Sequence, residues 1–142
     1  MKDISLADDE KQDLLKKINN CGLAQTMGIE VYDLDHGYAK SRLKVEKKHL
    51  NVLDILHGAA VLCLADYTAG AARTTLGVDV VALQINSNFT GAIIGIGLEE
   101  TIYCEARSVV EDQRIIYQEI MVNDGNGHLI TMITVTGIKP VN

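Results

Sequence analysis

The sequence has no Trp, a single Phe, a single Pro and only three Cys in 142 residues. Aromatic residues make up 4% of the chain, so a core must be built from Ile, Val, Leu and Ala. One Pro against twelve Gly excludes Pro-rich linkers and indicates tight turns. Because Cys21, Cys63 and Cys104 form no C-x-x-C pair, the sequence predicts reduced thiols in a cytoplasmic protein rather than a disulfide framework or a zinc site.

An excess of positive charge is also absent. The net charge is −6 and the pI about 5.1, which argues against general binding of nucleic acid but leaves room for a local pocket that binds one phosphorylated small molecule. Residues 1–17 are too charged for the apolar core of a signal peptide. The mostly apolar run 55–72 carries Asp66 near its middle and many Gly and Ala residues, which favours a helix buried in protein over a membrane span.

The chain does contain the ordinary balance of a globular protein, with 47% hydrophobic and 23% charged residues. Its length, without repeats or linkers, predicts a single domain over residues 1–142. Apolar spacing predicts an amphipathic helix over 7–20 and a longer, apolar helix over 57–77. Short connections between the strands predict an antiparallel meander around the long helix, an α+β architecture. The expected strands cover 28–35, 38–46, 78–89, 97–111, 114–123 and 128–139.

Asp66, within the long apolar helix, is the first candidate for chemistry. A carboxylate in apolar surroundings is expected to be poorly solvated and more basic than a surface Asp, with room beside it for a ligand or another backbone. The alternative is a structural ion pair with Arg73, or with Arg107 or Arg114 from a strand. The neighbours of Asp66 at helical spacing are almost all small or apolar: Ala59, Leu62, Cys63, Ala69, Gly70 and Arg73.

His57 and Gly58 stand where this helix is expected to begin. Backbone N–H groups of a first helical turn lack internal partners, and Gly58 has no side chain to block access to them, so a developing oxyanion can be held there. The alternative is a turn glycine beside a capping His. Gly58 and Asp66 are eight residues apart, about 12 Å along one helix, whereas a reacting carbon needs both groups within about 3–3.5 Å. An active site here therefore predicts an obligate dimer, in which antiparallel helices of two chains form two shared sites.

Together, Asn51, His57-Gly58 and Asp66 resemble the signature of hotdog-fold thioesterases of the phenylacetic acid degradation (PaaI-like) type. That signature reads roughly N-x-x-G-x-x-H-G-G, followed by an acidic residue in the central helix. The resemblance implies a hotdog fold, in which five or six antiparallel strands wrap one long central helix, here preceded by a short N-terminal helix. It also implies a homo-oligomer whose active site is shared across the dimer interface, and a dimer of dimers.

By the same resemblance, the substrate is an acyl-CoA thioester, and no metal or organic cofactor is required. Asp66 would act as general base or nucleophile, and Asn51 would position the water or the leaving thiolate. Gly58 would donate its backbone N–H to the thioester carbonyl, while His57 would fix the entry to the helix. The residues expected to contact the substrate are Ala59, Leu62 and Ala82.

Three positions depart from the family's pattern. Ala59 replaces the second Gly of the motif and narrows the acyl pocket. Asp54 replaces the usual Gly of the preceding loop and brings a second acid near the site. Ala82 falls where many members have a Ser or Thr that helps hold the attacking water or the nucleophile. Acyl specificity would depend on pocket depth, set by side chains such as Met27, Tyr32, Leu62 and Phe89.

Two other functions are weighed for the same fold. A non-catalytic acyl-CoA-binding module, acting as a sensor or regulatory subunit, is favoured by Ala82 and Asp54. The presence of Asp66 beside Asn51 argues against it, as does an N-terminal stretch too short and acidic to bind DNA. A hydratase or dehydratase would need a His-acid motif that is not found in the sequence.

Further signals are interpreted as structural. The run 91–97 lacks the Gly-Lys-Ser/Thr of a phosphate loop and is expected to connect strands without opening a helix. His57 and Asp66 would point to opposite faces of a helix, which argues against a metal site. Solvated side chains are expected at His36, His49 and His128. A strand face that meets solvent or another subunit is expected at Gln84, Asn86 and Asn88.

Overall fold

The computed structural model describes residues 5–140, and residues 1–4 and 141–142 of the predicted domain lie outside this range. Two helices, α1 (Asp8–Asn19) and α2 (Gly22–Met27), precede the first two strands, β1 (Ile29–Asp35) and β2 (Tyr38–Lys44). The 3-10 helix η1 (Lys47–His49) and a loop lead into the long helix α3 (Gly58–Thr74). The remaining elements are β3 (Val81–Phe89), the 3-10 helix η2 (Gly91–Gly95), β4 (Thr101–Glu111), β5 (Ile115–Asn123) and β6 (Leu129–Ile138).

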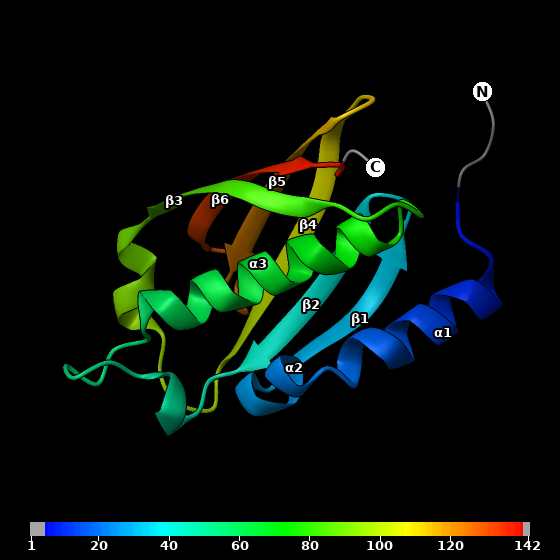
Figure 1. Cartoon of the computed structure of the whole chain (residues 1–142). Helices are drawn as coiled ribbons and strands as arrows, with labels where there is room; N and C mark the ends of the chain where they lie inside the picture. The colour runs from blue at the N-terminus through cyan, green and yellow to red at the C-terminus, as the bar shows by residue number, and fades with distance from the viewer. Residues whose placement is uncertain (1–4, 141–142) are drawn as a thin grey trace.

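One antiparallel sheet contains all six strands in the order β1-β2-β4-β5-β6-β3. Figure 1 shows the sheet curling around α3, with α1 lying beside β1. The structure therefore confirms the predicted α+β architecture, a six-stranded antiparallel sheet wrapped around one long helix with a short N-terminal helix.

The position of β3 differs from the predicted meander. Strands β4, β5 and β6 do follow one another in the sheet, but β3 pairs with β6 at the far edge. The end of α3 lies against β6, since Arg73 Cδ would be 3.5 Å from a Cβ built at Gly137. A Cβ at Gly137 would also lie 2.8 Å from Val80 Cγ1, so only a glycine lets the segment before β3 approach β6 this closely. After α3, the chain therefore re-enters the sheet as β3 beside β6, and then reaches β4 through η2.

The core lies between α3 and the concave face of the sheet. On α3 the buried face consists mainly of Ala residues, which let the helix lie close to the strands. No aromatic side chain is buried within residues 5–140, in agreement with the composition. Alternate strand residues point inward and are fully buried, among them Leu34, Leu43, Ile102, Ile120 and Ile133.

The sequence pattern did not predict the short helix α2. The helix expected over 7–20 ends at Asn19, and six further helical residues begin at Gly22. They end at Gly28, whose φ of 75° is a left-handed conformation that glycine adopts readily. A segment this short offers too few apolar positions for a helical period to be recognised.

His49 is buried, so the expectation of a solvated side chain is wrong for this residue. Its Nδ1 accepts the N–H of Glu46 at 2.9 Å, and its Nε2 donates to the carbonyl of Met27 at 2.7 Å. These bonds tie η1 to the end of α2. His128 is exposed, whereas His36 is half-buried, with Nε2 3.3 Å from a carboxylate oxygen of Glu111.

The run 91–97 also differs from its prediction, because η2 is a turn of 3-10 helix within it. Thr90 caps this turn, its Oγ1 accepting the N–H of Ala92 at 3.2 Å. The turn still serves as a connection between β3 and β4, as expected.

Candidate active site

The loop that leads into α3 is folded back on itself around Asn51. A bridge between Leu50 and Leu56 closes the loop. The Oδ1 of Asn51 accepts the N–H groups of Leu53 and Ile55 at 2.9 and 3.2 Å. Because two hydrogen bonds already occupy this oxygen, the side chain has its Nδ2 amide to offer a ligand.

Asp54, in the same loop, has a φ of 57°. This left-handed conformation favours Gly, and Asp is one of the few other residues that tolerate it. The backbone therefore keeps a glycine-like shape where the family's signature has Gly, and the substitution adds an exposed carboxylate.

Helix α3 begins at His57, which is its N-cap. The Nδ1 of His57 accepts the N–H of Ala59 at 3.0 Å, and its carbonyl accepts the N–H of Ala60 at 3.0 Å. The N–H of His57 is in turn held by the carbonyl of His49 at 2.8 Å. Within residues 5–140, the N–H of Gly58 has no acceptor, so the first turn offers one free donor, at the residue without a side chain.

Phe89, at the end of β3, covers one side of Gly58. A Cβ built at Gly58 would lie 3.4 Å from Cζ of this ring, at ordinary contact distance. The ring is itself 41% exposed. The free N–H of Gly58 therefore lies beside an apolar wall that the single chain leaves partly uncovered.

Asp66 lies on the face of α3 that the sheet does not cover, and it is exposed. The expected poorly solvated environment is therefore wrong for the single chain, because no other element covers this side of the helix. An ion pair with arginine is also absent from the described residues: Arg107 pairs with Glu105, and Arg73 binds the amide of Gln118. Ala59 is exposed and Leu62 half-buried.

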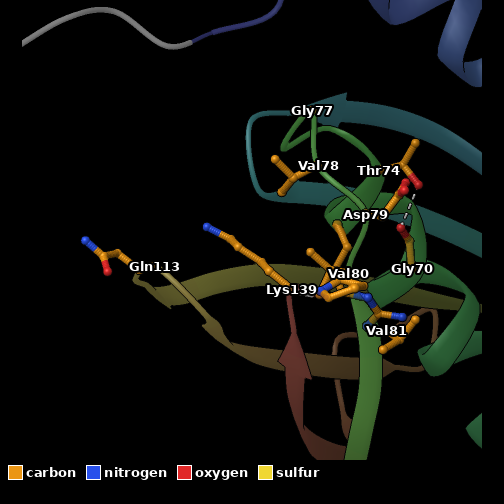
Figure 2. A pocket seen from close by; sticks show the side chains of 11 residues that line it. Gly70, Thr74, Gly77, Val78, Asp79, Val80, Val81, Gln113 and Lys139 are labelled. Carbon is orange, nitrogen blue, oxygen red and sulfur yellow. Dashed lines mark hydrogen bonds between the residues drawn. The ribbon is translucent and has the colours of Figure 1, made fainter. Parts of the chain in front are cut away.

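Two cavities lie along the second half of α3. The smaller, of about 280 Å³, is lined by Asp66 together with Tyr67, Gly70 and Arg73 among others. The larger, of about 1010 Å³, extends toward the start of β3 and the end of β6. Figure 2 shows this larger cavity, with Gly70 and Thr74 of α3 on one side and Lys139 on another.

The single chain does not bring the predicted catalytic groups together. Asn51, His57 and Gly58 gather at the entry to α3, but they line neither cavity. Asp66 is eight residues further along the same helix, about 12 Å from Gly58 along its axis. This is the arrangement from which the sequence predicts a site shared by two chains.

Strand β3 is exposed over almost its whole length, since eight of its nine residues are exposed and Ser87 is half-buried. It pairs with β6 on one edge, and no described element covers the other. Ala82 lies here opposite Gly137, next to Val81 of the larger cavity, but it lines neither cavity itself. Gln84, Asn86 and Asn88 are exposed on one face of this strand, as expected.

Sequence reasoning missed two features of this region. Arg73 was considered only as a partner for Asp66, whereas it is buried and lines both cavities. The only signal in the sequence is its place in a helix of small residues. Tyr32, expected in the acyl pocket, lies on the exposed face of β1 instead, with its ring 4.9 Å from the guanidinium carbon of Arg42.

Burial and charge shift two groups beside Asp66. Burial, with a smaller effect of the Asp66 charge, raises the pKa of the Cys63 thiol. Burial raises the pKa of Tyr67 to about 12, and its hydroxyl donates to the carbonyl of Ile18. Both groups are therefore uncharged near neutral pH.

Residues 5–140 contain neither a membrane-spanning helix nor a cluster of metal-ligating side chains. None of the helices there is long and apolar enough to cross a membrane. The same residues contain no group of three or more His, Cys, Asp or Glu side chains placed to hold a metal ion.

Comparison with known proteins gives several sequence relatives and many similar structures. No protein-family model matches the sequence. A Saccharolobus solfataricus protein named "Putative esterase" is 30% identical over 105 residues, which are 72% of this chain and 67% of that protein. The PaaI protein from the E. coli phenylacetic acid degradation operon has a similar structure, with a TM-score of 0.82, 19% identity and coverage of 92% of this chain and 93% of the other.

A hypothetical thioesterase protein from Streptococcus pneumoniae, solved with coenzyme A, is also similar in structure. Its TM-score is 0.74 at 19% identity, and the match covers 82% of this chain and 96% of that one. These structural matches establish that the sheet and helix described above form a hotdog fold, as the sequence predicts.

Proposed function

We propose, from the premise that the chain belongs to the PaaI-like family of hotdog-fold thioesterases, that it hydrolyses an acyl-CoA thioester to a free acid and CoA. The observation that carries this proposal is the pairing of two groups on one helix. The free N–H of Gly58 suits a developing oxyanion, and Asp66 on the uncovered face suits the activation of water. The coenzyme A in the S. pneumoniae structure supports the substrate class.

In the proposed reaction, the Asp66 carboxylate takes a proton from a water molecule as that water attacks the thioester carbonyl. The carbonyl oxygen becomes negative and is held by the N–H of Gly58 from the partner subunit. Collapse of the tetrahedral intermediate breaks the C–S bond and releases the CoA thiolate, a good leaving group. We assign Asp66 as the general base because its exposed carboxylate is open to water; direct attack by Asp66 is the alternative within the same site.

Asn51 and His57 have different supporting roles in this proposal. The Nδ2 amide of Asn51 can donate to the thiolate or to the oxygen of the attacking water, since its Oδ1 is occupied by the loop. His57 fixes the first turn of α3 and leaves the Gly58 N–H as its free donor. Ala59 and Leu62 lie between Gly58 and Asp66 on the same helix and would contact the acyl group.

The shared site requires a dimer, and β3 is the edge that suits it. Its free edge and exposed Val81, Leu83 and Ile85 are what an uncapped strand needs in order to pair with a second copy. Two-fold symmetry makes such pairing antiparallel, so the start of β3 meets the end of the partner's β3. Because Phe89 at that end lies beside Gly58, this pairing would bring Gly58 of the partner subunit toward the cavities beside Asp66.

A second pairing of dimers would use the convex face of the sheet. Large side chains there are partly exposed on neighbouring strands, and Met121 is paired directly with Met132. Burying such a patch is favourable in proportion to its apolar area. The exposed residues concerned are Tyr103, Tyr117, Met121 and Met132.

Release of free thiol from a panel of short, medium, long and aryl acyl-CoAs tests the proposal, with wild type compared to Asp66→Asn. We expect turnover of at least one class by the wild type and loss of turnover in the variant, which should still bind substrate. No release from any thioester, together with tight binding of acyl-CoA, would refute hydrolysis. It would support the alternative of a non-catalytic acyl-CoA-binding module, which Ala82 and Asp54 favour.

A further inference from the structure

Arg73 is a buried cation that forms no ion pair with a described residue. Its side chain lies at the end of α3 and the residue is 8% exposed. No carboxylate of the described residues lies within ion-pair distance of it. Burying a charge without a hydrogen-bonded counter-charge is costly, and burial accordingly lowers the pKa of Arg73, an effect that the more distant Asp66 charge offsets only in part. The chain nevertheless carries this cation at the wall of both cavities.

The guanidinium is held in place by a neutral group. Its Nη1 donates to Oε1 of Gln118 at 2.9 Å. Gln118 is fully buried, and its own Nε2 donates to the carbonyl of Ala69 at 3.0 Å. This chain of hydrogen bonds fixes the plane of the guanidinium but neutralises none of its charge.

The Nε and Nη2 groups of the guanidinium donate no hydrogen bond to a described residue. The Nε of Arg73 is buried without a partner. The Nη2 has no hydrogen-bond acceptor among the described residues and lies next to Gly70, where a Cβ would come within 3.5 Å of it. A glycine at this position leaves the approach to Nη2 open from the cavity that Asp66 also lines.

From these contacts we propose that Arg73 binds a carboxylate at the far end of the acyl group, so that the preferred substrates are thioesters of dicarboxylic acids. The inference rests on the proposed thioesterase function, because it takes Asp66 to mark the position of the thioester carbonyl. Arg73 follows Asp66 by seven residues, about 10 Å along the same face of α3. An acyl chain of moderate length spans that distance, and a guanidinium recognises a carboxylate through two parallel hydrogen bonds.

The phosphates of CoA are a poorer fit for the same donors. They stand beyond the long pantetheine arm, whereas Arg73 is buried about 10 Å from Asp66, which is within reach of the far end of an acyl chain. Lys139 lines the larger cavity and adds positive charge at its mouth, while Asp79 of the same cavity opposes it. The net charge of the chain is −6, so the two cations gathered here, Arg73 and Lys139, are a local feature of this region and not of the whole surface.

The test compares kcat and KM for adipyl-CoA and suberyl-CoA with those for hexanoyl-CoA and octanoyl-CoA, which have the same chain lengths and no carboxylate. We expect the wild type to prefer the dicarboxylic substrates. Arg73→Gln should raise their KM by about 10- to 100-fold, the range expected for a charge-assisted hydrogen bond, and change the neutral substrates less than about 3-fold. Arg114→Gln, at an exposed arginine, is the matched control.

Arg73→Lys keeps the charge but removes the two-pronged geometry, so it tests the inference if Arg73→Gln does not fold. It should lower the preference for dicarboxylic substrates while retaining part of it. An equal loss for charged and neutral substrates in the variants would overturn the inference. So would a penalty that disappears with adipyl-pantetheine, which has the acyl carboxylate but no phosphate, because the contact would then be to CoA.

Calorimetric binding to the Asp66→Asn variant separates this inference from the proposed function. Tighter binding of adipyl-CoA than of hexanoyl-CoA, lost with the added Arg73→Gln change, supports the carboxylate site even if the wild type hydrolyses neither. Hydrolysis that depends on Asp66 but shows no preference for a carboxylate refutes the role of Arg73 and leaves the thioesterase proposal in place.

Discussion

Replacing Gly58 by Ala separates the role of this residue in the fold from its role in the reaction. The added Cβ would lie 3.4, 3.7 and 3.8 Å from three atoms of the Phe89 ring, which is contact without a clash. Gly58 is helical and its φ is not positive, so the backbone accepts Ala. Ala is the better helix former by about 0.5–1 kcal/mol, and covering the methyl contributes up to about 0.8 kcal/mol. We therefore expect the free energy of unfolding to rise by about 0.5–2 kcal/mol.

The kcat of Gly58→Ala should fall, although its stability does not. The methyl group stands beside the free N–H of the first turn, and losing one oxyanion donor costs about 10²- to 10³-fold in kcat. Thermal unfolding followed by circular dichroism, together with thiol release at saturating substrate, measures both effects on one preparation. A Tm lowered by many degrees would refute the contact geometry. An unchanged kcat in a stable Gly58→Ala protein would refute the oxyanion role.

Three further predictions concern the dimer edge, an acid-sensitive contact and the thiols. Ile85→Lys, at the middle of β3, places a charge in the proposed dimer interface. The dimer dissociation constant, measured by analytical ultracentrifugation, should rise at least about 100-fold. A variant that stays dimeric would argue against pairing through the edge of β3. The N–H of Leu6 donates to Asp35 and lowers the pKa of its carboxyl group. The stability difference between wild type and Asp35→Asn should therefore be largest above about pH 4 and vanish as the pH falls through the lowered pKa. Urea midpoints that differ equally at pH 3 and pH 7 would contradict this. The N–H of Leu23 lowers the pKa of the exposed Cys21 thiol, whereas burial raises the pKa of the Cys63 thiol. Mass spectrometry should therefore find that iodoacetamide modifies Cys21 first, and faster labelling of Cys63 would contradict the assigned environments.

Local signals in the sequence were sufficient for most of the elements. Strand alternation and apolar helical spacing predicted β1, β2 and α3 closely, because each period reflects burial on one face of a single element. The place of β3 was not predictable in this way, since pairing with β6 depends on the space that Gly137 leaves for Val80. The burial of His49 depends similarly on a carbonyl of Met27, 22 residues earlier.

The candidate site shows the same difference between local contacts, which the sequence predicts, and contacts between distant residues, which it does not. Asn51, His57 and Gly58 are close in sequence, and the bridge between Leu50 and Leu56 folds the loop that carries Asn51 back to the start of α3. The environment of Asp66 could not be derived from its helix neighbours, because those residues leave its side chain uncovered in the single chain. Arg73 depends on Gln118, 45 residues away, and that contact leaves no pattern in the sequence.

Complementation between two inactive variants tests most directly whether the active site is shared. Asp66→Asn and Gly58→Ala, each with its own affinity tag, are co-expressed, and thiol release by the mixed dimers is compared with that of each parent. A mixed dimer has one site with both changes and one intact site, so equal mixing of subunits should restore about a quarter of wild-type activity. Activity no higher than that of the parents, in a preparation shown to contain mixed dimers, would contradict a site built from Asp66 of one chain and Gly58 of another.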